Sequence, residues 1–72
     1  MTPAEAMEKA VQEIRAHKGV GIERAVYCAI GAATAFERIG AFSLDEGVEW
    51  CQAARDAGDT QRIRLARRSL ER

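Results

Sequence analysis

The chain has 72 residues, in which 11 lysines and arginines balance 11 aspartates and glutamates, with one histidine and two cysteines. This length allows one small domain with a limited core, and two cysteines are too few for a disulfide scaffold. A formal net charge of zero removes the simplest argument for a nucleic-acid-binding protein, because such proteins usually carry a basic excess.

The composition predicts an all-α fold. Alanine, the strongest helix former, accounts for 14 residues, and Pro3 is the only proline. β-Branched residues are few, and no segment alternates apolar and polar residues as a strand would. We therefore expect a single small helical domain over residues 1–72, built from three to four short helices.

The first helix is expected over residues 3–18. Thr2 can cap it, Pro3 suits its first position, and Glu5 completes a capping box. Glycines on both sides of Val20 then predict a break in the chain, because glycine is favoured at hinges and tight connections.

The second helix, expected over residues 22–39, carries an unusually wide apolar surface. At 100° per residue its apolar side chains cover an arc of about 220°, whereas an amphipathic helix usually buries nearer 100°. Such a helix must contact neighbours on two sides. The residues that we expect to form a homodimer interface are Ile22, Ala25, Val26, Ala29, Ala33 and Phe36.

The third helix is expected over residues 44–57. Gly40 would end the helix before it, and Ser43 with Glu46 forms a second capping box. Gly58 would end the third helix, since glycine is common just after a helix.

A fourth helix is expected over residues 60–71, with Asp59 as its cap. Its thin apolar stripe consists of Ile63, Ala66 and Leu70. Leu65 would point away from that stripe.

Charge is divided along the second half of the chain. Residues 43–58 carry one basic and four acidic side chains, a net charge of −3. Residues 59–72 carry five basic and two acidic side chains, a net charge of +3. The neutral chain is therefore expected to be strongly dipolar.

No constellation of residues predicts a catalytic, cofactor-binding or metal site. His17, the only histidine, is expected at a helix end, where it suits the helix dipole. Cys28, Cys51 and His17 lack metal-ligand spacing, and a closed zinc site needs four ligands. Both cysteines fall inside apolar arcs, which predicts small buried side chains. In a helical hairpin Cys51 would lie opposite Ala32, which disfavours a disulfide.

Self-association is the best-supported inference. The second and third helices should form a central antiparallel hairpin over about residues 22–57, because their connection is short. One hairpin partner and a thin first helix leave part of the second helix uncovered, and uncovered apolar area marks an interface. We expect a dimeric helical bundle. The alternative is a monomeric bundle in which the first and fourth helices close both sides.

The last segment leaves a DNA-binding interpretation open. Its arginines could contact phosphates or a groove, and they are Arg62, Arg64, Arg67 and Arg68. A helix-turn-helix template matches at Ala54 and Gly58 but fails at Asp59, which places charge where that template needs an apolar residue.

The run Gly40–Glu46, GAFSLDE, precedes a helix that bears Trp50. In its size, its two capping boxes and this run, the chain resembles the short alanine- and arginine-rich helical proteins that phages and prophages encode. That resemblance implies a small non-enzymatic protein that binds a host protein and inhibits or redirects it.

We therefore expect a non-enzymatic homodimer that binds an unidentified protein to inhibit or regulate it, with a small DNA-binding regulator as the alternative. No signal-peptide pattern opens the chain, and its longest uncharged run, residues 25–36, is too short to span a bilayer, so a cytoplasmic location is expected. The residues expected to bind the partner are Trp50, Leu65, Arg64, Arg67 and Arg68.

Overall fold

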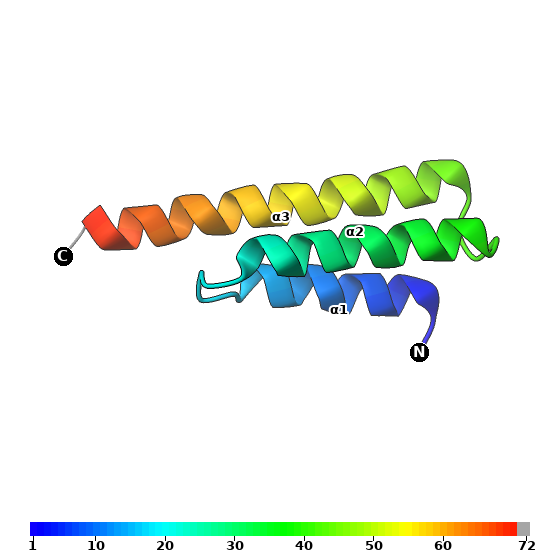
Figure 1. The fold of residues 1–72 in the computed structure, drawn as a ribbon, viewed down its shortest axis with the longest axis horizontal. Coiled ribbons are helices and arrows are strands. Elements are labelled where there is room, and N and C mark those ends of the chain that lie inside the picture. The colour runs from blue at the N-terminus through cyan, green and yellow to red at the C-terminus, as the bar shows by residue number, and fades with distance from the viewer. Residues whose placement is uncertain (71–72) are drawn as a thin grey trace.

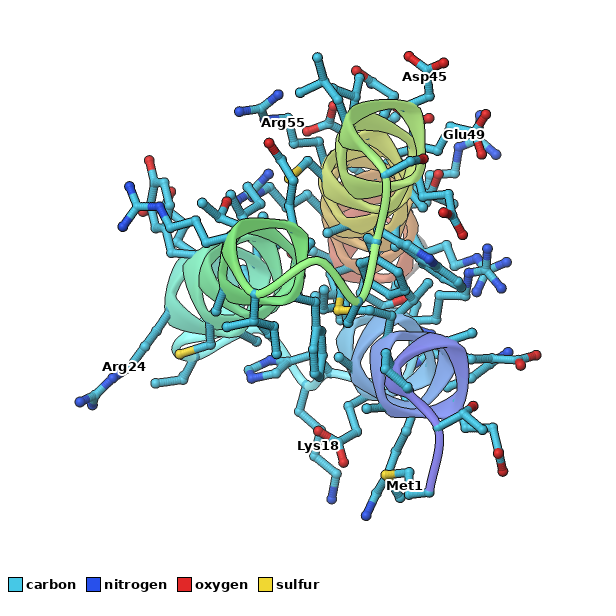
Figure 2. The ribbon with its side chains drawn as sticks, turned by 90° about the vertical axis from the view of Figure 1, so that its right-hand side faces the viewer. Met1, Lys18, Arg24, Asp45, Glu49 and Arg55 are labelled. Carbon is cyan, nitrogen blue, oxygen red and sulfur yellow. The ribbon has the colours of Figure 1, made fainter. Side chains whose placement is uncertain are left out.

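Three α-helices make up the computed structural model, which describes residues 1–70 (Figure 1). They are α1 (Pro3–Arg15), α2 (Ile22–Arg38) and α3 (Leu44–Leu70). Helices that follow one another in the chain run in opposite directions, and α3 extends past the other two at its C-terminal end. Seen end-on, the three helices form a triangle in which each packs on the other two (Figure 2). The predicted all-α class is confirmed.

The start of α1 agrees with the sequence prediction. The Thr2 hydroxyl accepts a hydrogen bond from the Glu5 amide at 3.1 Å, and the Glu5 carboxylate accepts one from the Thr2 amide at 3.2 Å. The helix ends at Arg15, three residues before the predicted end at residue 18. The early end is a correction, and it arises because the connection to α2 begins after Ala16, which forms the C-cap.

The turn between α2 and α3 is built from local signals. Gly40 has a φ of +80°, a left-handed conformation that glycine adopts without strain. The Ala41 amide donates to the Phe36 carbonyl at 2.8 Å and the Gly40 amide donates to the Glu37 carbonyl at 3.0 Å. This pair of hydrogen bonds is the Schellman arrangement that ends helices. The predicted end near residue 39 is therefore correct to within one residue.

The predicted break at Gly58 is wrong. Helix α3 continues through this residue to Leu70, so the two helices expected over residues 44–57 and 60–71 are one helix of 27 residues. Gly58 is buried, and a Cβ atom there would lie 2.7 Å from Cγ2 of Val26 on α2. The glycine therefore permits a close helix contact, at the expense of about 1 kcal/mol in helix propensity.

Asp59 does not cap a new helix, because its carboxylate accepts from Arg62 within α3 at 3.1 Å. Glu71 and Arg72, which the predicted last helix and basic tail include, lie outside the described residues.

The core fills the centre of the triangle with side chains from all three helices. Phe42, in the turn, contacts Phe36 with 5.3 Å between ring centroids and Trp50 with 6.4 Å. Met7 and Ile14 of α1 are fully buried. The buried apolar residues are Met7, Val11, Ile14, Ile22, Val26, Ala29, Ala33, Phe42, Ala54 and Ala57.

The second capping box predicts a pH dependence of stability. The Glu46 carboxylate accepts a hydrogen bond from the Ser43 amide at 3.0 Å, and the Ser43 hydroxyl accepts one from the Glu46 amide at 3.2 Å. The hydrogen bonds with the backbone and side chain of Ser43 hold the pKa of Glu46 below its ordinary value. A lowered folded-state pKa stabilises the fold above the unfolded-state pKa, and this contribution is lost as the pH falls through the folded value.

The melting temperatures of the wild type and of Glu46→Gln should therefore differ most at neutral pH. This difference in melting temperature should vanish in acid. Glu49→Gln removes a charge from the same helix without removing a cap, and serves as the control. A difference that stays constant down to about pH 3, below the ordinary glutamate pKa, would refute this role for the carboxylate.

Candidate interaction surface

The C-terminal end of α3, residues 63–70, projects from the three-helix body and is called the arm. Its last contacts with the body involve the loop between α1 and α2. The Gln61 amide donates to the His17 carbonyl, and Leu65 lies against Gly19, where an added Cβ would be 3.4 Å from Cδ1 of the leucine. Residues 66–70 are all exposed, and in Figure 1 they reach past that loop.

The apolar residues of the arm face the opposite way from the prediction, since the predicted stripe is exposed and Leu65 packs inward. Ile63 is 54% exposed and Leu70 85% exposed, and Ala66 is also on the surface. Leu65, which was expected to point elsewhere, is the half-buried residue. The correction follows from the continuous helix, because without a break at residue 58 the helical phase is set by the buried residues Ala54, Ala57 and Gln61 upstream.

The residues predicted to bind a partner fall into two groups. Arg64, Arg67 and Arg68 are exposed on the arm. Trp50 and Leu65 are half-buried and pack on the body, Trp50 through its stacking contact with Phe42. The arginines therefore form the accessible part of the predicted surface.

The residues predicted to form the dimer interface lie inside one chain. Ile22, Val26, Ala29 and Ala33 are buried in the core, while Ala25 and Phe36 are partly buried against it. The reason is that α1 and the continuous α3 both pack on α2 and cover most of the wide apolar arc, of which Cys28, Ala35 and Ile39 stay exposed. A dimer of this fold must use another surface.

A shallow cavity of about 200 Å³ lies between α2 and α3 on the side turned away from α1. Its lining is formed by Glu23, Val26, Tyr27, Ile30, Arg55, Asp59 and Arg62. Arg62 pairs here with Asp59 at 3.1 Å and with Glu23 at 3.9 Å, so the first of the four candidate DNA-binding arginines is engaged within the chain.

A second shallow cavity, of about 340 Å³, lies between α1 and α3 near the arm. Arg15 from α1 and Arg64 from α3 both line it, together with Asp56, Ala57 and Thr60. Arg15 was not among the residues predicted to bind a partner, because nothing along the chain indicates that the end of α1 lies beside residue 64. The two arginines extend the basic side of the arm onto the body.

The cysteines have different environments. Cys51 is half-buried, and its thiol lies 3.9 Å from the Ile30 carbonyl as a weak donor. Cys28 is exposed, which corrects the prediction that both are buried, because its side of α2 faces neither α1 nor α3. Both thiols are free, as predicted.

We expect the Cys28 thiol to react with a chromogenic thiol reagent at least about ten times as fast as the Cys51 thiol, because thiol reactivity follows accessibility. A Cys28→Ser variant should retain only the slow phase, and both thiols should react quickly in denaturant. Equal rates in the native protein would contradict the burial of Cys51.

His17 has a structural contact in the loop, where its Nδ1 accepts a hydrogen bond from the Gly19 amide at 3.1 Å. Over residues 1–70, histidine, cysteine and acidic side chains nowhere gather in a group of three or more that could hold a metal ion. None of the three described helices has the length and apolar character needed to cross a membrane. Comparison with protein families, with characterised proteins and with solved structures finds no match to this chain.

Proposed function

We propose that the protein acts by binding and not by catalysis, as a homodimer in the cytoplasm that docks on another protein and inhibits or regulates it. The observation that carries this proposal is the arm. Beyond Leu65 the helix continues past its own bundle with residues 66–70 all exposed, and the large side chain of Leu70 stands there beside arginines instead of in the core.

The composition of the arm favours a protein partner. Ile63 and Leu70 are exposed on one side, and the helical spacing places Arg64 and Arg68 on another. Arginine is enriched at the energetic centres of protein interfaces, where its stem packs and its head forms bidentate hydrogen bonds. A single exposed leucine is ordinary, but an apolar and basic helix end is typical of a docking segment.

Charge indicates the kind of surface that fits. Arg15, Arg64 and Arg68 would attract an acidic partner and fix its orientation. Occlusion of that acidic surface is a sufficient mechanism of inhibition, and it agrees with the role that the resemblance to small phage-encoded helical proteins implies.

The proposal is tested by site-specific crosslinking in extracts of the source cell. A photoreactive residue at position 68 should give an adduct with a defined protein, whereas one at position 24 should not, because Arg24 projects from α2 on another side of the bundle (Figure 2). With the photoreactive residue kept at position 68, the pair Arg15→Glu and Arg64→Glu should abolish that adduct, and the reversal Arg24→Glu should leave it. An adduct that forms equally from both positions, or none from position 68, overturns the proposal.

DNA binding remains a second candidate on one observation. Within residues 1–70, no carboxylate forms an ion pair with Arg64, Arg67 or Arg68. If these arginines contact phosphates, affinity for random duplex DNA should fall steeply with salt, with a slope of about −0.9 per phosphate contacted. A signal that is absent at low salt removes this candidate.

A further inference from the structure

We infer that the homodimer forms by antiparallel pairing of α3 with α3 of a second copy, along the exposed face of α3 that is turned away from α1 and borders α2. This inference rests on the proposed function, because it supplies the surface for the dimer proposed there. The face is called the outer face of α3. Its residues are Leu44, Val48, Gln52, Arg55, Asp59, Ile63, Ala66 and Leu70.

Every residue of the outer face is exposed, and the apolar ones lie at its two ends. Leu44 is 66% exposed and Val48 58% exposed near the start of α3, and Leu70 is 85% exposed near its end. Arg55 and Asp59 occupy the middle. In Figure 2, Arg55 projects from α3 on the side away from α1, over the edge that borders α2. The intervals of three and four residues keep all these positions on one side of a helix.

The outer face is complementary to itself when reversed. A two-fold axis at the level of Ala57 places Val48 opposite the partner's Ala66 and Arg55 opposite the partner's Asp59. Leu44 then lies opposite the partner's Leu70. Together with Val48 and the partner's Ile63 these two leucines form an apolar cluster. Each end of the pair buries one such cluster, and two opposite-charge pairs lie between them.

The charge division along α3 favours the same orientation. Within α3, residues 44–58 carry a net charge of −3 and residues 59–70 a net charge of +3, so the continuous helix is a dipolar rod with two oppositely charged halves. Antiparallel pairing sets each acidic half beside the partner's basic half and opposes the two helix dipoles. Parallel pairing would place Arg55 beside the partner's Arg55, which is unfavourable. Symmetric pairs of this kind are the commonest homodimers.

The neighbouring surface also fits a second helix. Arg55 and Asp59 line the cavity between α2 and α3 beside Tyr27, which is 72% exposed. A second α3 on the outer face would cover part of this tyrosine. The basic side of the arm, with Arg64 and Arg68, faces another direction and stays open to the partner protein.

Oxidative crosslinking of two single variants tests the orientation. In a background with Cys28→Ser and Cys51→Ser, one chain carries Val48→Cys and another Ala66→Cys. Each variant oxidised by itself should stay uncrosslinked, because the antiparallel register separates identical positions by about 27 Å along the helix. An equimolar mixture should give a covalent dimer with copper phenanthroline. Crosslinking of each variant by itself but not of the mixture overturns the inference.

Charge exchange supplies an independent readout on the uncrosslinked chain. Arg55→Asp and Asp59→Arg should each weaken the dimer about tenfold or more, because two opposite-charge pairs become like-charge pairs. Mixing the two variants should restore association of wild-type strength as a heterodimer, because both charge pairs between the chains again have opposite signs. Contacts within each chain stay as altered by its own substitution, so recovery reports only on the contact between chains. Failure of the mixture to recover overturns the pairing.

Sedimentation of the wild type separates the two possible failures. If the wild type forms a concentration-dependent dimer and the dissociation constant is unchanged in both charge variants, this pairing is overturned and the proposed function stays intact. A chain that stays monomeric up to high micromolar concentration overturns the dimer of the proposed function as well. Crosslinking from position 68 to a partner protein is measured independently of either result.

Discussion

Replacing Ile14 by alanine is expected to lower the free energy of unfolding by about 2–5 kcal/mol. Ile14 is fully buried and lies in the core where α1 packs on α2 and α3. The loss combines the transfer free energy of the deleted methyl groups with the cavity that they leave. A domain of this size is stable by about 4–11 kcal/mol, so the variant loses a large share of its stability.

Urea denaturation followed by circular dichroism measures this loss, at one fixed protein concentration because self-association would add to apparent stability. Val20→Ala is the matched control. Val20 is 96% exposed in the loop, so its truncation should change stability by no more than about 0.5 kcal/mol. Equal midpoints for Ile14→Ala and the wild type would show that α1 does not pack on the other helices as described.

The helix starts and one helix end could be predicted because their signals are local. Thr2 and Ser43 each form a capping box with a glutamate three residues later, and every atom involved belongs to one turn of chain. Gly40 ends α2 through hydrogen bonds to residues a few positions back. Such features depend little on the rest of the fold and can therefore be predicted from the sequence.

The fate of the apolar arc of α2 could not be predicted, because it depends on contacts between distant segments. Its width correctly indicated that α2 touches neighbours on two sides, but not which neighbours. The structure assigns both sides to α1 and α3 of the same chain, which buries Val26 and Ala29. The exposed apolar residues Leu44 and Val48 appear instead on α3, whose phase is fixed by the residues it buries.

Continuity of α3 changes the meaning of the charge pattern. Two separate helices with net charges of −3 and +3 would be two independent surfaces. One helix of 27 residues with the same charges is a rod with an acidic N-terminal half and a basic C-terminal half. This order suits the dipole of the helix itself, since acidic residues favour the start and basic residues the end. It also makes reversed pairing the favourable arrangement for two copies.

Gly58→Ala is expected to destabilise the protein by about 1–2 kcal/mol, although alanine is the better helix former by about 1 kcal/mol. The added Cβ would lie 2.7 Å from Cγ2 of Val26, closer than real Cβ atoms come. Val26 is buried and β-branched, so its side chain cannot turn aside without disturbing the core. The overpacking therefore outweighs the gain in propensity.

Gly31→Ala is the same chemical change as Gly58→Ala, but it is expected to change the free energy of unfolding in the opposite direction. Gly31 lies in α2 with nothing within 4 Å of an added Cβ, so alanine there should raise stability by about 0.5–1 kcal/mol. Combining Gly58→Ala with Val26→Ala should recover about 0.5–3 kcal/mol relative to the sum of the single losses, because the smaller side chain removes the clash. If Gly58→Ala stabilises the protein as Gly31→Ala does, residue 58 is not held against α2, and the continuity of α3 requires another cause.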